Sequence, residues 1–308
     1  MTKASAPGKI ILFGEHAVVY GQPALAVPVT QVGVEVNIVE SARSGIWIDA
    51  PDVDLQAELN MLPSDHPIAS VIHNFLFLSR VTPFPHLHIK ITSSIPVASG
   101  LGSGAAVTVA LTRALASHLH YPMAEEEVNA FAYEIEKLHH GTPSGIDNTV
   151  ITYALPVYFV RGEPIETFQV GQPFLILIAN TGIPAPTKES VGDVGRLWME
   201  DKPRWETVFA RIGEISFAAR RAIEAGIPGL LGELMNENHA LLQTLTVSSP
   251  ELDRLVETAL HAGALGAKMS GGGRGGNMIT LVEAETADSV SVALEKAGAQ
   301  GTILTRVS

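Results

Sequence analysis

A glycine-rich turn at residues 96–106 is the segment best suited to bind an anion. It reads PVASGLGSGAA and leads from an expected strand into an expected helix. The glycines at 100, 102 and 104 let a phosphate approach the backbone, and the free N–H groups and dipole at a helix start attract negative charge. Ser103 could ligate Mg²⁺ or contact a phosphate. The alternative is an ordinary loop that ends in a glycine N-cap.

Two common nucleotide-binding patterns do not describe this turn. The P-loop pattern GxxxxGK[ST] is absent, because the only Gly-Lys pair, Gly8-Lys9, is followed by isoleucine. Segments 100–105 and 271–276 both fit a loose dinucleotide fingerprint. A dinucleotide fingerprint lies between a strand and a helix, and a second strand follows that helix. After segment 100–105 we expect two helices in succession, and segment 271–276 is expected to follow a helix and precede a strand. A Rossmann fold is therefore disfavoured.

Two acidic residues, Glu136 and Asp147, could provide metal binding and base catalysis. Glu136 lies at the end of an expected helix, and Asp147 follows a turn that contains proline and glycine. Such an arrangement can direct two carboxylates into one cleft, where one binds a metal ion and the other accepts a proton. A helix end with a capping turn and a solvated acid is the alternative, and the residues alone do not decide between the two.

Cations beside glycines are further candidate contacts for an anion. Lys9 lies in an expected apolar strand, so it is either an edge residue or a buried cation directed at a ligand. Lys268 and Arg274 accompany a run with five glycines, and we expect this segment to bind a polyanion; a flexible loop is the alternative. Paired histidines are spaced poorly for one metal ion and HExxH is absent, so a histidine metal site is disfavoured.

The elements that must position these residues form a mixed pattern. Apolar runs and alternation predict strands, and apolar residues at helical spacing predict helices. We expect strands at 9–13, 24–40, 86–95, 149–160, 173–180, 277–283 and 302–307, and helices at 67–79, 104–119, 124–140, 203–225, 229–245, 250–263 and 286–297. The chain is thus β-rich at first and helix-rich later, with a break in the proline-containing segment TGIPAPTK.

Composition excludes several classes of function. The 308 residues are 46% hydrophobic and 17% charged, which excludes global disorder. The net charge of −12 leaves no basic excess for nucleic acid, and no apolar run approaches the roughly 20 residues that span a bilayer. The absence of cysteine excludes disulfides and thiolate chemistry. We expect a cytoplasmic protein without a nucleic-acid or membrane partner, in which local groups hold any anion against the overall field.

Three motifs in sequence order resemble those of the GHMP kinase superfamily, named for galacto-, homoserine, mevalonate and phosphomevalonate kinases. They are APGKIILFGEHAVVYG (6–21), IPVASGLGSGAA (95–106) and KMSGGGRGGNMITL (268–281). The mevalonate kinases are the most similar members, through GEHAVVYG and through residues 136–147. The resemblance covers the whole chain and implies an α+β fold of two domains: a ribosomal-protein-S5-like domain at 1–182 and a helix-rich, ferredoxin-like domain at 183–308.

Carried over by position, the resemblance implies roles for the motif residues. Asp147 would be the catalytic base and Lys9 the active-site lysine, while Glu136 and Ser103 would bind Mg²⁺. The substrate would contact His16, Glu15, Ser144, Thr181 and Gly272. ATP would contact Pro96, Ser99, Gly100, Leu101, Gly102, Ser103, Gly104 and Ala105. The family often has two serines in the second motif, whereas Gly104 follows Ser103 here, so Ser103 would have to supply that contact.

The resemblance also implies a reaction. ATP, with Mg²⁺, would phosphorylate the C5 hydroxyl of (R)-mevalonate to 5-phosphomevalonate, a step in isoprenoid precursor synthesis. A homodimer is expected by analogy with the family. Two alternatives stay open. One is another small-molecule kinase of the superfamily, acting on phosphomevalonate, homoserine or a sugar, and the other is a non-catalytic regulator on the same fold.

Overall fold

Two compact units make up the chain in the computed structural model, which describes residues 1–96, 100–140 and 143–308, with His140 described by its backbone alone. Unit 1 comprises Met1–Gly8, Val32–Val97 and Gly102–Ala154. Unit 2 comprises Lys9–Gln31, Ala98–Leu101 and Leu155–Ser308. Two long strands, β1 (Thr2–Phe13) and β2 (Ala24–Glu40), each contribute residues to both units.

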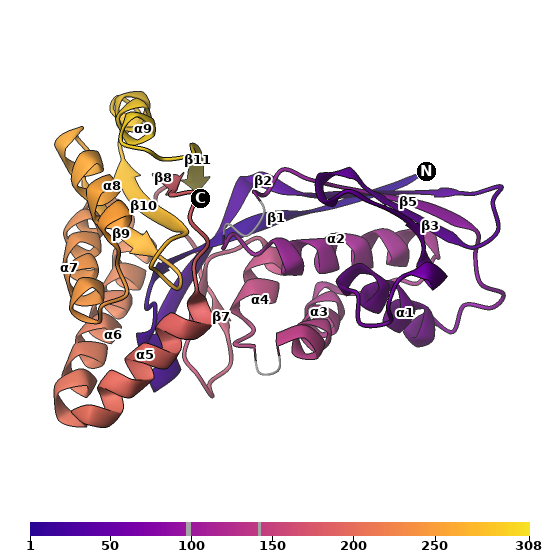
Figure 1. Cartoon of the computed structure of the whole chain (residues 1–308), viewed down its shortest axis with the longest axis horizontal. Helices are drawn as coiled ribbons and strands as arrows, with labels where there is room; N and C mark the ends of the chain where they lie inside the picture. The colour runs from indigo at the N-terminus through magenta and orange to yellow at the C-terminus, as the bar shows by residue number, and fades with distance from the viewer. Residues whose placement is uncertain (97–99, 141–142) are drawn as a thin grey trace. The chain divides into compact units, whose positions relative to one another are not determined.

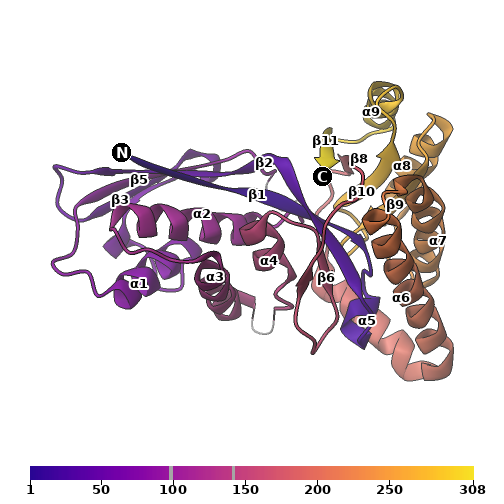
Figure 2. The ribbon, with the colours of Figure 1, turned by 180° about the vertical axis from the view of Figure 1, so that it is seen from behind.

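Unit 1 is a sheet with helices packed on one face. From Val34 onward β2 pairs antiparallel with β5 (Leu87–Ser93), which runs parallel to β3 (Ile46–Ala50), and β3 pairs antiparallel with β4 (Leu55–Glu58). Helices α1 (Pro67–Ser79), α2 (Ser103–His118) and α3 (Glu125–His140) lie on one face of this sheet (Figure 1, Figure 2), and α4 (Ile146–Tyr153) packs against α2 and α3. The predicted alternation in β2 puts Val34, Val36 and Ile38 inward, where they are buried.

Unit 2 is built on a second, antiparallel sheet with strand order β11-β8-β10-β9. The strands are β8 (Phe174–Asn180), β9 (Gly266–Ser270), β10 (Asn277–Val282) and β11 (Gly301–Val307). Helices α7 (Leu231–Thr244) and α8 (Pro250–His261) pack on β9 and β10, and α9 (Ala287–Lys296) packs on β8 and β11 (Figure 1). Apolar side chains of these layers, such as Leu177, Leu242, Leu255 and Met278, form one buried cluster.

The remaining elements of unit 2 surround this core. Helix α6 (Lys202–Glu224) packs against α7, and α5 (Thr187–Glu200) packs against α6. Short strands β6 (Val157–Phe159) and β7 (Glu166–Thr167) pair with each other, and β6 also pairs with the first residues of β2. A 3₁₀ turn, η4 (Pro228–Leu230), precedes α7.

The mixed α and β content is confirmed, and α1 and β2 have the predicted limits of 67–79 and 24–40. The strand predicted at 149–160 is wrong for most of its length, because α4 continues to Tyr153 and only Val157–Phe159 is a strand. The β-branched residues of this stretch favour a strand in isolation, but burial against α2 and α3 decides for a helix.

The predicted ranges lack strands β3, β4, β7 and β9 and helix α5. Strand β9 includes the first residues of the third motif, where we expect a helix directly before the glycines. Helix α5 follows the proline-containing break and includes Gly192 and Gly195, which weaken its helical pattern. Both elements are stabilised by the sheet or helix beside them rather than by their local sequence.

The predicted domain boundary between residues 182 and 183 stays a prediction. Strand β8 precedes it but pairs with β10 and β11, so the sheet of unit 2 takes strands from both sides of that position. In the described part of the chain, no helix combines the length and apolar character needed to cross a membrane.

Candidate active site

The Gly14-Glu15-His16 turn after β1 has a constrained backbone. Gly14 has φ +94°, and a Cβ there would lie 2.3 Å from the carbonyl oxygen of Pro23, so glycine is required. His16 has φ +61°, in the left-handed region that residues other than glycine seldom adopt. In the following 3₁₀ helix η1 (Ala17–Tyr20), the Tyr20 ring stacks on Phe209 of α6 with 4.0 Å between centroids. This stack fixes the turn on the core of unit 2.

Three side-chain contacts join the first motif to the third within unit 2. Ser270 Oγ donates to the Ile11 carbonyl at 2.7 Å, Lys268 Nζ donates to Glu15 Oε1, and His16 Nε2 donates to the Gly272 carbonyl at 3.0 Å. Gly272 must be glycine here, because a Cβ would lie 2.4 Å from the hydroxyl oxygen of Thr187. Both motifs are identifiable in the sequence, but these pairings across more than 250 residues are not.

His16 is neutral in the folded protein at neutral pH. Burial lowers the pKa of His16 from 6.5 to about 4, although its hydrogen bond to Gly272 acts in the opposite direction. A carbonyl can only accept, so the neutral ring carries its proton on Nε2 and leaves Nδ1 as an acceptor. Among the described residues, neither His16 Nδ1 nor Glu15 Oε2 has a hydrogen-bond partner, and both atoms are buried. Two buried acceptors on consecutive residues suit a ligand that brings hydroxyl donors.

The structure corrects the expectation that Lys268 and Arg274 bind a polyanion. Lys268 is fully buried and forms an ion pair with Glu15, and burial lowers the pKa of its ammonium group. Arg274 forms an ion pair with Asp193 of α5, and its Nε donates to the Thr246 carbonyl at 3.2 Å. Each cation is therefore paired with a carboxylate of unit 2 and contributes to the stability of that unit.

Lys9 lies within β1 with 7% of its surface exposed, which favours the buried cation over the edge residue. Its backbone N–H donates to the Leu101 carbonyl at 2.9 Å, and this bond ties the first motif to the second motif within unit 2. Leu101, predicted to contact ATP, is itself buried, so its backbone rather than its side chain is the part that a ligand could reach.

The second motif leads into helix α2 as predicted. Gly100 and Gly102 have φ +74° and +75°, and Gly102 is the N-cap of the helix, with no side chain bonded to the cap in the described part of the chain. The N–H groups of residues 103–105 have no acceptor within the helix and, with the helix dipole, form an anion site. Pro96 is exposed just before the motif, whereas Ser99 lies outside the described residues.

A cavity of about 350 Å³ in unit 1 opens beside the start of α2. Its lining residues are Ala50, Asp52, Val53, His66, Pro67, Ile68, Ile91, Ser93, Ile95, Ser103, Gly104, Val107 and Thr108. Asp52, from the 3₁₀ turn η2 (Pro51–Val53), accepts from the Ser93 N–H at 2.7 Å, while His66 Nδ1 is buried with no partner among the described residues. The size and the mixed lining suit a purine base. No sequence motif marks Asp52 or His66, which the fold alone brings to the second motif.

Glu136 and Asp147 both lie in unit 1 and are half-buried, Glu136 about one turn before the end of α3 and Asp147 in the first turn of α4. Ser144 Oγ accepts from the Ile146 N–H at 3.3 Å just before Asp147. The described residues include no group of three or more His, Asp or Glu suited to hold a metal ion. Mg²⁺ needs fewer protein ligands, because it keeps waters and phosphate oxygens. The Glu136 carboxylate and the Ser103 hydroxyl are oxygen donors of the kind that Mg²⁺ takes, so the residues present fit it.

Thr181, predicted to contact the substrate, holds the third motif in place. Its N–H and its hydroxyl both donate to the Gly276 carbonyl at 2.9 Å, and its Oγ1 accepts from the Ile183 N–H at 3.2 Å. The hydroxyl proton is thus already used, which leaves one lone pair for a ligand. A contact between Thr181 and the substrate stays a prediction.

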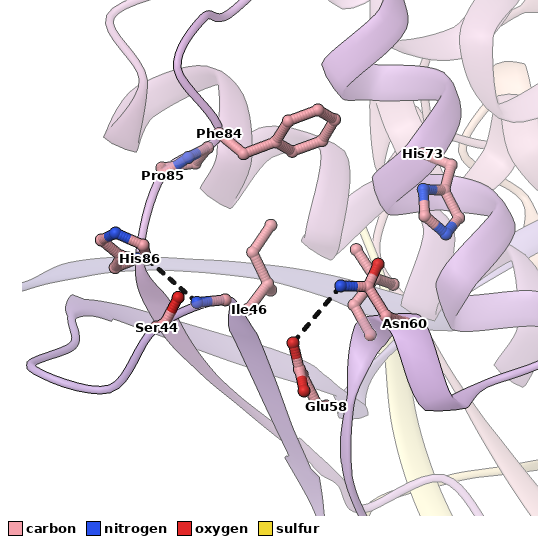
Figure 3. Close-up of a pocket in the computed structure, with 10 residues that line it drawn as sticks. Ser44, Ile46, Glu58, Asn60, His73, Phe84, Pro85 and His86 are labelled. Carbon is pink, nitrogen blue, oxygen red and sulfur yellow. Dashed lines mark hydrogen bonds between the residues drawn. The ribbon is translucent and has the colours of Figure 1, made fainter.

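A second cavity of unit 1, of about 310 Å³, contains none of the predicted site residues (Figure 3). Phe84 lies at its side, and several of its polar groups already have hydrogen bonds. Asn60 Nδ2 donates to Glu58 at 3.3 Å, and His86 Nδ1 accepts from the Gly45 N–H at 2.9 Å. In the cavity beside α2, by contrast, His66 Nδ1 is buried and has no partner in the described chain.

Comparison with known proteins places this chain in a family. The family described as GHMP kinases N terminal domain matches residues 68–154, and the one described as GHMP kinases C terminal matches residues 219–300. A mevalonate kinase of Pyrococcus abyssi is 36% identical over 99% of this chain and 95% of its own length. A mevalonate kinase of Methanothermobacter thermautotrophicus is 32% identical over 90% of this chain and 89% of its own length.

Solved structures agree with these sequence matches. The structure of L. major mevalonate kinase in complex with R-mevalonate has a TM-score of 0.88 at 29% identity and covers 100% of this chain and 96% of its own. The Methanococcus jannaschii mevalonate kinase also has a TM-score of 0.88, at 26% identity over 99% of this chain and 98% of its own. The chain therefore belongs to the GHMP kinase family and has its two-domain α+β fold.

Proposed function

We propose that this chain transfers the γ-phosphoryl group of ATP to the C5 hydroxyl of (R)-mevalonate, forming 5-phosphomevalonate and ADP. The observation that carries the proposal is the pair of buried acceptors without partners in the described chain, Glu15 Oε2 and His16 Nδ1, on neighbouring residues of the first motif. Such a pair suits a substrate with hydroxyl donors. Relatives named mevalonate kinase, similar along 99% of this chain, supply the choice of alcohol.

The nucleotide site belongs to unit 1 in this proposal. The base occupies the cavity beside α2, where His66 Nδ1 and the Asp52 carboxylate offer polar contacts between apolar walls. The phosphates lie at the backbone N–H groups of residues 103–105. Gly104 leaves room for them, because a Cβ at that position would meet nothing within 4 Å.

The reaction demands positioning and charge stabilisation rather than covalent chemistry from the protein. Asp147 accepts the proton of the C5 hydroxyl as that oxygen attacks the γ-phosphorus. Lys9 stabilises the negative charge on the attacking oxygen. Glu136 and Ser103 would hold Mg²⁺, which would supply positive charge to the phosphate oxygens when bound. His16 and Glu15 orient the alcohol, with the Gly272 carbonyl accepting the hydrogen bond of the His16 ring, and Ser144 stays a predicted substrate contact.

One observation favours mevalonate over an acceptor that is already phosphorylated. Arg274 and Lys268 of the third motif are both paired with carboxylates of unit 2 and are not offered to a second phosphate. Phosphate recognition normally uses such cations in bidentate or close contact. Likenesses to a phosphomevalonate kinase and a galactokinase, at 18% and 20% identity, show the fold alone.

An ADP-release assay with ATP, Mg²⁺ and a panel of alcohols tests the proposal. The panel contains (R)-mevalonate, 5-phosphomevalonate, homoserine and galactose, and we expect turnover with mevalonate and background rates with the others. Faster turnover with another alcohol would assign a different kinase of the family. ATP binding without turnover on any alcohol would favour the non-catalytic regulator.

The proposal also covers the cellular compartment, the pathway and the oligomeric state. We place it in the cytoplasm, in isoprenoid precursor synthesis, with the chain as a homodimer by analogy with its family. Light scattering coupled to size exclusion measures the mass in solution. A mass near 65 kDa, about twice the 32.7 kDa chain, is expected for the dimer.

A further inference from the structure

The buried ion pair between Lys268 and Glu15 is the feature of unit 2 that the proposed reaction leaves unexplained. Their side chains are 0% and 1% exposed, so water screens neither charge. The Lys268 ammonium also donates to the Met269 carbonyl at 2.7 Å and lies over the Phe13 ring at 5.8 Å. Lys268 is therefore held by three separate contacts at one point in the core.

Glu15 is held less completely than its partner. Its Oε1 accepts from Lys268, while its Oε2 is buried with no partner in the described part of the chain. A buried carboxylate oxygen left without a donor is costly, and such atoms in native proteins usually await a ligand or a water. A pair that served only stability could be replaced by apolar residues of similar volume with no loss. Replacing the pair with apolar residues would, however, remove Glu15 Oε2, the acceptor that has no partner in the described chain.

We infer that Lys268 is a positioning residue that holds the Glu15 carboxylate in the orientation in which Oε2 accepts a hydrogen bond from the acceptor substrate. His16 Nδ1, on the next residue, is the second acceptor, because Gly272 fixes the proton of that ring on Nε2. This inference rests on the proposed function. It assigns Glu15 and His16 to a hydroxyl that takes no part in the transfer, because Asp147 already receives the proton of the reacting one.

Mevalonate carries a second hydroxyl, on C3, which the inference assigns to these two acceptors. A site built to bond a hydroxyl rejects an analogue that lacks it, because the buried polar atoms then stay unpaired. The probe is 5-hydroxy-3-methylpentanoate, which keeps the reacting C5 hydroxyl and lacks the one on C3. We expect the wild-type kcat/KM to favour mevalonate over this probe by a factor on the order of 10³ or more.

Variants of the pair separate positioning from stability. Lys268→Met alone leaves a buried carboxylate without its counter-ion, and we expect it to lower Tm by roughly 5 °C or more. The double variant Glu15→Met, Lys268→Met replaces the pair with two apolar side chains of similar length and should recover most of that loss. Lys296→Met, on the exposed surface of α9, is the matched control for loss of a lysine charge.

The specificity ratio is the readout that a merely structural pair would not move. We expect the ratio of kcat/KM for mevalonate to kcat/KM for the 3-deoxy probe to fall at least tenfold in the folded double variant. The fall should come mainly from a higher KM for mevalonate, while KM for ATP should stay within about twofold of the wild-type value. An unchanged preference in the double variant, or a wild-type preference near one, would overturn the inference.

Nuclear magnetic resonance of the His16 ring separates this test from the proposed function. The Lys268 charge contributes to the low pKa of His16, so the pKa should rise from about 4 in Lys268→Met, which keeps Glu15, and stay in the Lys296→Met control. If the wild type fails to phosphorylate mevalonate, the proposed function fails. A rise in the His16 pKa would still support placement of the Lys268 charge beside the acceptors, and an unmoved pKa would refute it.

Discussion

Acid should destabilise unit 2 through His16. Burial lowers the pKa of this imidazole from 6.5 to about 4, so between these values the unfolded chain binds a proton that the folded chain does not. The stabilisation by neutral His16 is complete above pH 6.5 and is lost as the pH falls toward 4. His16 is 5% exposed, so solvent screening removes little of the effect.

The magnitude follows from the two pKa values. A drop from 6.5 to about 4 corresponds to about 3 kcal/mol of unfolding free energy, and about 2 kcal/mol of it is lost between pH 7 and pH 5. The measurement is urea unfolding at pH 7, 6 and 5, followed by the fluorescence of Trp198 and Trp205 of unit 2 in a Trp47→Phe background. The comparison variant is His16→Asn, because asparagine tolerates the left-handed φ of +61° and its amide can still donate to Gly272.

We expect the wild type to lose about 2 kcal/mol more than His16→Asn between pH 7 and pH 5. His261→Asn, at an exposed position on α8, controls for the loss of a histidine and should follow the wild type. His239 is also buried with a lowered pKa, and it remains in all three proteins, so it cancels from the difference. Equal losses in the wild type and His16→Asn would refute the neutral, buried imidazole and with it the free Nδ1 acceptor.

The remaining predictions concern the proposed catalytic and nucleotide groups. Asp147→Ala and Lys9→Met should each lower kcat by at least about 10²-fold with the fold intact, and near-wild-type turnover in either would remove that residue from the mechanism. Glu136→Gln should shift the Mg²⁺ titration of activity to higher concentration, whereas an unchanged titration would exclude Glu136 as a metal ligand. Val107→Trp should fill the cavity beside α2 and raise KM for ATP at least roughly tenfold with little change in KM for mevalonate; equal ATP affinity would place the base elsewhere.

Local sequence was sufficient where one element's own pattern decides its structure. The alternation in β2 and the helical spacing in α1 gave the observed limits, because each has one face on the core of unit 1. For residues 149–153, packing against other helices rather than local sequence decides the structure. Their β-branched side chains predict a strand, yet packing against α2 and α3 makes them part of helix α4.

In the candidate site, some features follow from local sequence and others only from the fold. Glycines at 14, 100 and 102 have positive φ, so their identity follows from the local backbone and marks the turns in the sequence. The partner of Glu15 does not follow from anything local, because Lys268 lies 253 residues away and its own surroundings suggest a phosphate contact. The cavity beside α2 is harder still to predict, since Asp52 and His66 belong to no motif and meet only in the folded unit.

The net charge of −12 sharpens the question of how this chain binds a polyanion. The third motif cannot be the main answer, because Arg274 and Lys268 are neutralised by carboxylates of their own unit. In the proposed function, phosphate binding rests on Lys9, on the N–H groups at the start of α2 and on Mg²⁺, and the last two need no basic surface. Backbone N–H groups can approach a phosphate closely only where side chains are small, as at Gly102 and Gly104. Under the proposed function, glycine rather than lysine or arginine is therefore the residue type that marks the nucleotide site in this acidic chain.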